Sequence, residues 1–418
     1  MVKIALLKQG KQKNQVLSHI IFKLVFMVNF NNTEVAFKGK DEKDLKRSYW
    51  LFKIISWSWL IKIGPAMLKL FLPLKFPIPI IKSTIYKQFC GGETINECDE
   101  TINELGKNNV KTILDYSVEG KESEADFDAN VIETLSTIAK AKTTKLIPFS
   151  VFKVTGFARF ALLEKINDKK ELTSQEKEDF ERVKARVDKM CSAAFEAGIP
   201  IFVDAEETWI QNTIDDLVLD MMRKYNHSKA IVFNTAQMYR WDRIDYLKQL
   251  KTIAEQENFF IGMKLVRGAY IEKERERAAA KGYKDPMQAT KKDTDNDFNA
   301  ALKFCVENIN RISFCCGTHN EESTQYLIDL MQKHQIVLDD PRVYFAQLLG
   351  MSDHISMNLA KEGFNVTKYV PYGPVKDVIP YLIRRAEENT SIAGQTGREL
   401  SLILKEKERR ELFPVVIK

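Results

Sequence analysis

Eight short apolar runs, rich in β-branched and aromatic residues, alternate along this chain with longer segments of helical periodicity. The runs are 110–116, 145–153, 199–205, 230–237, 259–270, 312–319, 343–350 and 366–373. The helical segments include 173–197, 207–225, 241–257, 287–308, 322–334 and 375–388. Strands joined by helical crossovers pair in parallel, and nearly continuous apolar strands are buried on both faces. Eight such units in about 280 residues predict an α/β fold of the (βα)8 TIM-barrel type.

An open, doubly wound sheet is the alternative that the same alternation allows. That fold commonly carries a glycine-rich phosphate loop after its first strand. Neither GxGxxG nor GxxxxGK occurs in the 418 residues, so the barrel is favoured.

Polar or ionisable residues stand at the carboxyl end of every predicted strand. They are Asp115, Lys153, Asp204, Gln237, Arg267, Tyr270, Thr318, His319, Gln347, Tyr369 and Tyr372. One or two of them could mark no more than the end of a strand, but all eight strands carry them. In a barrel these ends converge on one mouth, where the chemistry of this fold takes place. A shared active site is therefore predicted there.

The helical segment after the last strand carries two adjacent arginines. Tyr381, Arg384, Arg385 and Glu388 share one face of this helix. Two interpretations remain open. Arg384 could form a solvated ion pair with Glu387 or Glu388, which stabilises little. Alternatively, the two arginines hold a small carboxylate as a bidentate fork, with Glu388 orienting one of them.

The other strand ends predict further contacts. Lys153 and Asp204 end neighbouring strands, so an ion pair between them is expected. The small residues of the Arg-Gly-Ala turn at 267–269 let the backbone approach a flat or phosphorylated group closely. Thr318 and His319 offer hydrogen-bond donors. We expect His319 to contact a phosphate or cofactor rather than a metal, since no second histidine lies at ligand spacing.

Metal and nucleophilic chemistry are not expected. The strand ends supply only two carboxylates, Asp115 and Asp204, and no Ser-His-Asp or Cys-His set stands out. The six cysteines are scattered without a CxxC pair, which indicates free thiols in a reduced compartment.

Residues 1–88 are predicted to form a basic, apolar-rich helical region ahead of a barrel spanning 89–418. Residues 1–89 hold 16 Lys and Arg against 4 Asp and Glu, a net charge of +12 in a chain of net charge +6, so the remainder carries −6. Contact with an acidic membrane surface and a solvated basic face on packing helices both fit this pattern. Nucleic acid fits poorly, because the aromatic residues cluster with Leu and Ile. Lysines interrupt the apolar stretch 49–82 well short of the ~20 residues that span a bilayer, and Met27 is a second candidate start.

Several stretches together resemble the proline dehydrogenase family, in its monofunctional, mitochondrial-type form. They are "FCGGET" (89–94), "LDYSVEG" (114–120), "DAEE" (204–207), "KLVRGAY" (264–270), "THN" (318–320), "FAQLLGM" (345–351), "KYVPYGPV" (368–375) and "YLIRRAEEN" (381–389). The likeness covers about residues 89 to 410. It implies a distorted (βα)8 flavoenzyme that oxidises L-proline to Δ1-pyrroline-5-carboxylate and passes electrons from FAD to a membrane quinone.

The resemblance also implies roles for individual residues. Arg384 and Arg385 would grip the proline carboxylate, and Lys153 and Asp204 would complete the pocket as catalytic residues. The residues expected to enclose the proline ring are Tyr270, Leu349, Tyr369 and Tyr381. The residues expected to hold the flavin are Ala205, Gln237, Lys264, Arg267, Gly268, Ala269, Thr318 and His319. Lys264 falls where many bacterial members have an arginine, and Arg267 falls where they have a lysine. Lys264 is expected to take part in catalysis.

Two other functions remain alternatives to proline oxidation. One is a folate-reductase-like flavin barrel that uses a pyridine nucleotide, and the other is a proline-binding sensor without turnover. The expected location is a bacterial cytoplasm, peripheral to the inner membrane, with the mitochondrial matrix side of the inner membrane as the alternative. Residues 1–88 would then make the membrane contact.

Overall fold

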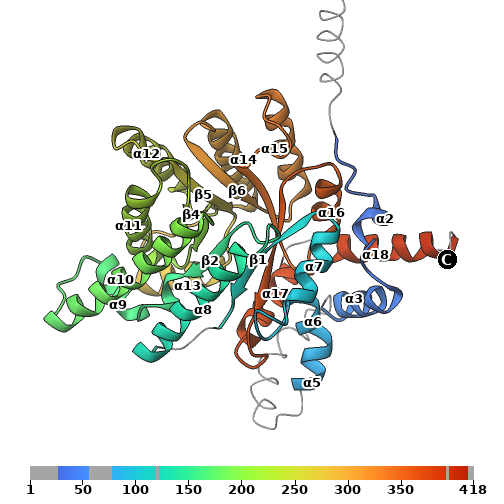
Figure 1. Ribbon diagram of the computed structural model, residues 1–418, viewed down its shortest axis with the longest axis horizontal. Helices are drawn as coiled ribbons and strands as arrows, with labels where there is room; N and C mark the ends of the chain where they lie inside the picture. Colours follow the sequence, from blue (N-terminus) through green and yellow to red (C-terminus); the bar gives the residue numbers. More distant parts are fainter. Residues whose placement is uncertain (1–26, 56–77, 119–121, 392–394, 413–418) are drawn as a thin grey trace, which may run out of the picture.

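The computed structural model describes residues 27–55, 78–118, 122–391 and 395–412. For residues 386–391, 395, 396 and 412 it describes the backbone alone. Within these ranges, eight strands and the helices between them form a barrel (Figure 1).

All eight strands run parallel. They are β1 (Val110–Tyr116), β2 (Ser150–Lys153), β3 (Ile201–Asp204), β4 (Val232–Gln237), β5 (Ile261–Val266), β6 (Ile312–Gly317), β7 (Val343–Leu348) and β8 (Val366–Tyr372). The pairing order is β1-β8-β7-β6-β5-β4-β3-β2, and a bridge between Ile113 and Phe149 brings the β2 end of the sheet back to β1. The predicted (βα)8 barrel is confirmed, and the doubly wound sheet is excluded.

Helices cover the outside of the barrel (Figure 1). Those between the strands are α8 (Glu124–Lys142), α9 (Phe160–Asn167), α10 (Ser174–Ala197), α11 (Thr208–Tyr225), α12 (Arg243–Gln256), α13 (Ile271–Lys281), α14 (Lys291–Glu307), α15 (Glu321–Lys333) and α16 (Asp353–Lys361). A short 3-10 helix (Val154–Gly156) follows β2. Local chemistry sets several boundaries: Thr173 and Glu176 form a capping box that starts α10, and Gly198, at φ 69°, ends it.

Segments that precede the first strand and segments that follow the last strand pack together beside the barrel. The earlier elements are α2 (Thr33–Ala36), α3 (Glu42–Ile55), α5 (Ile78–Ile81), a π-helix (Lys82–Tyr86), α6 (Lys87–Phe89) and α7 (Asp99–Lys107); the later ones are α17 (Ile379–Ser391) and α18 (Gln395–Leu412). Phe37, Phe52, Phe89, Tyr381 and Leu402 share one hydrophobic cluster. The Arg410 guanidinium on α18 donates to the carbonyls of Phe37 (3.0 Å) and Lys40 (2.9 Å). Helix α18 therefore joins the region before the barrel to the region after it.

The barrel interior is layered. An aromatic layer includes Phe149, Phe202 and Phe233, whose rings contact one another. Side chains of a strand alternate between faces, so residues two positions further along point the same way. The Asp204 side chain therefore points into the barrel like that of Phe202, one layer nearer the mouth. A charged layer, which we define as Asp115, Lys153, Asp204 and Lys264, therefore lies above the aromatic layer, at the carboxyl ends of the strands.

Within the described residues, no helix combines the length and the apolar character needed to cross a membrane.

Candidate functional site at the barrel mouth

A cavity of about 510 Å³ opens at the carboxyl ends of β1, β2 and β3. Its walls include Asp115, Lys153, Glu206, Tyr270 and Arg384. Lys153, Tyr270 and Arg384 come from β2, the start of α13 and α17, and all three are predicted site residues. The fold thus brings together side chains that are far apart in the sequence.

The charged layer holds a buried ion pair. The Lys264 ammonium donates to the Asp204 carboxylate and, at 2.7 Å, to the Tyr369 hydroxyl. The same ammonium lies 4.6 Å from the centre of the Tyr369 ring and 5.5 Å from that of Phe202. Burial, and next the Asp204 carboxylate, raise the pKa of Tyr369 well above its usual value, so this phenol stays protonated.

The structure gives Asp204 an ion-pair partner that the sequence analysis did not predict, Lys264. Lys153 does stand beside Asp204, since the two residues are in register on β2 and β3. Thr235 on β4 separates Asp204 from Lys264 on β5. Inward-pointing residues of alternate strands meet inside a closed barrel, and a long lysine side chain can span that gap. Adjacency along the sheet therefore does not reveal the contact between Asp204 and Lys264.

Arg267 and Gly268 form a rigid corner after β5. The Arg267 guanidinium donates to Asp295 (2.7 Å), Thr318 Oγ1 (2.6 Å) and Ser323 Oγ (2.9 Å), so its orientation is fixed. Gly268 has φ 131°, and a Cβ there would lie 2.6 Å from ring atoms of Tyr239. Only glycine fits this close approach.

His319, on the loop after β6, is held by one ring nitrogen. Its Nδ1 lies 2.9 Å from the Ser352 hydroxyl. Burial, helped by the positive charges of Lys368 and Arg385, lowers the pKa of His319 to about 3. The imidazole is therefore neutral at physiological pH, with Nε2 left to meet a ligand. The neighbouring Thr318 carbonyl accepts from Gln347 Nε2 (3.1 Å).

The two arginines of α17 have different surroundings. Arg384 lines the cavity. Arg385 is only 8% exposed and its guanidinium lies 5.1 Å from the Tyr381 ring centre. The burial of Arg385 suits a site that excludes water. The side chain of Glu388 lies outside the described residues.

The remaining predicted site residues also lie around the mouth. Gln237 Nε2 donates to the Glu206 carbonyl (2.7 Å), and the Leu349 amide donates to the Tyr369 carbonyl (2.8 Å). Ala205 is half-buried between Asp204 and Glu206, whereas Ala269 is exposed on the corner after Gly268.

Glu206 is a site residue to which the sequence analysis gave no role. Its carboxylate accepts hydrogen bonds from the Thr155 amide (3.0 Å) and hydroxyl, and it lines the cavity. Burial raises the pKa of Glu206 to about 7. The signal was the paired acid in "DAEE" directly after a predicted strand.

Asp115 lines the same cavity and accepts from the Ser117 hydroxyl (3.0 Å). Burial raises its pKa, against the opposing effect of the Lys153 ammonium. Two carboxyl groups whose pKa values are raised by burial thus line the cavity with Lys153.

All six cysteines are free and buried, as predicted for thiols without a disulfide framework. Among the described residues, no three or more His, Cys, Asp or Glu side chains are grouped to hold a metal ion.

The donor set around the mouth suits an anionic ligand with a flat ring. Arg267, Thr318 and His319 lie together at one side of the mouth. Gly268, beside Arg267, has no side chain to cover its backbone. Gly317 nearby also lacks room for a side chain, since a Cβ would lie 2.9 Å from Val266 Cγ1. A phosphorylated cofactor fits such a cradle.

Fold and site together define a (βα)8-barrel enzyme with a cationic, partly buried mouth. The family model described as "Proline dehydrogenase" matches residues 98–398. The chain belongs to the proline dehydrogenase family and is an oxidoreductase of that family.

Similar proteins agree with this assignment. The chain is 32% identical to "Proline dehydrogenase 1, mitochondrial" of Dictyostelium discoideum, over 91% of this chain and 75% of that protein. It is 40% identical to the Homo sapiens protein of the same name, over 57% of this chain and 40% of that one. It is 35% identical to "Carbapenem antibiotics biosynthesis protein CarD" of Pectobacterium carotovorum subsp. carotovorum, over 78% and 85%.

Among solved structures, proline utilization A (PutA) from Bdellovibrio bacteriovorus shares the fold. The TM-score is 0.70 at 19% sequence identity, and the match covers 88% of this chain. This chain spans only 40% of the PutA chain. The likeness supports the barrel fold alone.

Proposed function

We propose that this protein oxidises L-proline to Δ1-pyrroline-5-carboxylate with FAD as the hydride acceptor, the first step of proline catabolism. The observation that carries the proposal is the placement of Arg384 on the wall of the mouth cavity, with Arg385 buried beside it on the same helix. The family match supports the substrate.

Substrate binding follows from the shape and charge of this cavity. Arg384 and Arg385 hold the proline carboxylate, because a guanidinium pair matches a carboxylate in charge and geometry. Tyr270, Leu349, Tyr369 and Tyr381 enclose the apolar ring. Holding both ends of a small ring would orient its reacting carbon toward the acceptor, and positioning of this kind can supply a large part of a rate enhancement.

The cofactor is proposed from the donor set at the opposite side of the mouth. Gln237, Arg267, Thr318 and His319 supply donors for the phosphates and ring, and Ala205, Gly268 and Ala269 leave room for the backbone to approach. A bound flavin supplies the electron-pair acceptor for hydride transfer. Lys264 is held by Asp204 and Tyr369 at this end of the barrel, where its positive charge favours electron density arriving nearby.

The visible spectrum of the purified protein tests the activity. We expect flavin bands at about 380 and 450 nm, and bleaching of the second band when L-proline is added without oxygen. Bleaching by a reduced nicotinamide but not by proline would favour the folate-reductase-like barrel. A protein that binds proline and stays colourless after addition of FAD would be the sensor instead.

We further propose that a membrane quinone accepts the electrons and that residues 1–88 contact the membrane. Support comes from the charge of this region and from Trp50, which is 56% exposed on α3 beside Ile54, 39% exposed. Lys53 lies 5.1 Å from the Trp50 ring centre, and a tryptophan flanked by lysines suits the interface of an anionic bilayer.

Flotation with liposomes that contain anionic lipid tests this contact. Trp50→Ala is expected to reduce the bound fraction several-fold at moderate salt. Trp241→Ala is the matched control, because Trp241 is 48% exposed and its ring centre lies 4.1 Å from Lys284 Nζ. Trp241 precedes α12, which lies across the barrel from α3 (Figure 1). Equal binding by both variants and the wild type would rule out the proposed contact surface.

The proposed contact with a membrane quinone is compatible with two cellular locations. The cytoplasmic side of a bacterial inner membrane and the matrix side of the mitochondrial inner membrane give the enzyme equivalent access to quinone. The relatives named as mitochondrial support the matrix side.

A further inference from the structure

The loop between β7 and α16 carries Leu349 and is held from several directions. Gly350, at φ 75°, lies so close to residue 88 that a Cβ there would be 2.1 Å from the Gln88 carbonyl oxygen. The Gln88 side chain donates to the Gly350 carbonyl (3.0 Å), and Lys368 donates to the carbonyls of Leu348 (3.2 Å) and Met351. The loop is therefore fixed by segments outside β7 and α16.

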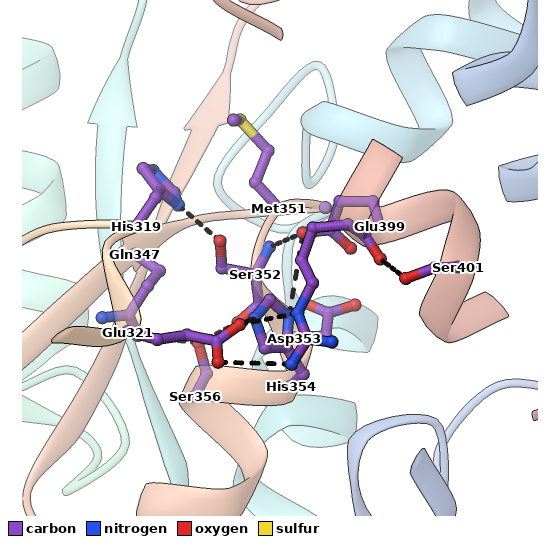
Figure 2. Close-up of polar contacts among 12 residues, drawn as sticks. His319, Glu321, Gln347, Met351, Ser352, Asp353, His354, Ser356, Glu399 and Ser401 are labelled. Atoms are coloured by element: carbon purple, nitrogen blue, oxygen red, sulfur yellow. Dashed lines mark hydrogen bonds and ion pairs between the residues drawn. The ribbon is translucent and has the colours of Figure 1, made fainter. Parts of the chain in front are cut away.

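Ser352, the last residue of this loop, is the contact between the loop and His319. It is fully buried and adopts the left-handed conformation, φ 52° and ψ 42°, which is uncommon for serine. Its amide donates to Glu399 Oε1 (2.6 Å), and its hydroxyl lies 2.9 Å from His319 Nδ1 (Figure 2). The carboxylate of Glu399 thus holds the backbone of the residue whose side chain holds the histidine.

Glu399 lies on α18 and is itself fixed. It is 3% exposed, and its Oε1 is 3.9 Å from His354 Nδ1. His354 Nε2 lies 2.9 Å from Glu321 (Figure 2). Glu321 also accepts from Arg398 of α18 at 2.8 Å. A charged network therefore anchors α18 to the start of α15 and α16.

We propose that Glu399 is a positioning residue for the cofactor-facing histidine: through the Ser352 amide it aims the Ser352 hydroxyl at His319 Nδ1, which fixes the ring and leaves Nε2 for the flavin. The inference rests on the proposed function only for the identity of the ligand. The orientation of the ring is a property of the protein alone and can be measured without the cofactor.

A buried hydrogen bond from an amide to a carboxylate is among the stronger ones, and its loss leaves a buried donor unsatisfied. We therefore expect Glu399→Ala to weaken FAD binding about tenfold. Glu399→Gln keeps an oxygen acceptor for the Ser352 amide and is expected to bind FAD within about twofold of the wild type. Glu399→Asp is too short to reach the amide and is expected to behave like the alanine variant.

The experiment has two readouts on the full chain. The first is the imidazole 15N spectrum of the flavin-free protein, which is tractable because the chain has only five histidines. The second is FAD affinity from quenching of flavin fluorescence. Glu406→Ala is the matched control: Glu406 is a fully buried carboxylate on the same helix, paired with Arg409 and Arg410 and not with Ser352.

In the wild type, the two His319 nitrogens should have the separate shifts of a single tautomer. Glu399→Ala, Glu399→Asp and Ser352→Ala are each expected to draw those shifts together, whereas Glu406→Ala leaves them unchanged. In a Ser352→Ala background, Glu399→Ala should weaken FAD binding less than twofold further, since the route through the hydroxyl is already broken.

Unchanged His319 shifts in Glu399→Ala or Glu399→Asp would overturn the inference, and so would a tenfold effect that persists in the Ser352→Ala background. If Glu399→Ala fails to fold, the aspartate and serine variants decide. Failure of the proposed function looks different, since wild-type protein would then bind no FAD while the nitrogen shifts still respond to Glu399.

Discussion

Changing Arg385 to lysine is expected to lower kcat/KM for L-proline about a thousandfold, with Arg384→Lys giving a loss of similar order. Lysine keeps the charge but cannot present two parallel N–H groups to a carboxylate. A thousandfold loss corresponds to about 4 kcal/mol of transition-state stabilisation, which is the scale of a bidentate charged contact in a site that excludes water.

Stopped-flow reduction of the flavin by proline measures this effect, and the flavin spectrum of each variant shows that the cofactor is still bound. Arg223→Lys is the control, because Arg223 forms an exposed ion pair with Glu257 on the barrel surface. If both arginine variants reduce flavin at the wild-type rate, the carboxylate fork is wrong.

Lys264→Met is expected to destabilise the flavin-free protein by about 3 kcal/mol, because it leaves the Asp204 carboxylate in the barrel without its ammonium partner. Lys264 is 5% exposed, so solvent compensates little. The double variant Asp204→Asn, Lys264→Met should recover most of the loss, since neither charge then remains.

Urea unfolding followed by circular dichroism gives the comparison. Lys248→Met removes the exposed partner of Asp245 and is expected to cost less than about 0.5 kcal/mol. A Lys264→Met protein as stable as Lys248→Met would mean that Asp204 is stabilised by other groups, with the neighbouring Lys153 the first to examine.

The sequence predicted the barrel because its signal is local and repeated. Each apolar run is long enough to form a strand, and the intervening helices carry their own caps, as at Thr173 and at Thr290, which caps α14. The boundaries were less accurate. The run 145–153 forms a strand only from Ser150 onward. Pro148 has no amide to donate to a ladder. The segment before Ser150 still contacts β1 through the bond from the Thr112 amide to the Leu146 carbonyl and the bridge between Ile113 and Phe149.

The mouth was predicted as a place but not as a set of contacts. Strand ends must converge in a barrel, so Lys153, Tyr270 and Arg384 could be expected near one another. The partner of Asp204 depends on which side chains meet across the closed interior, and that depends on strand register and curvature. No local pattern in the sequence encodes either.

The contact between Ser352 and Glu399 had no local signal at all. The two residues are 47 positions apart, and Ser352 gives no hint of a left-handed conformation, because glycine or asparagine would be the usual choice there. Such a conformation persists when surrounding contacts determine it. Here those contacts come from a helix that follows the last strand.

The contact between α18 and Ser352 makes the helix after α17 part of the structure that supports the barrel mouth. A polypeptide cut after residue 391 would keep all eight strands, the paired arginines and the whole mouth cavity, yet it would lack the acidic side chain that secures Ser352. On the proposal that Glu399 positions His319 through Ser352, the smallest fragment that fixes this ring therefore extends past the barrel and includes α18.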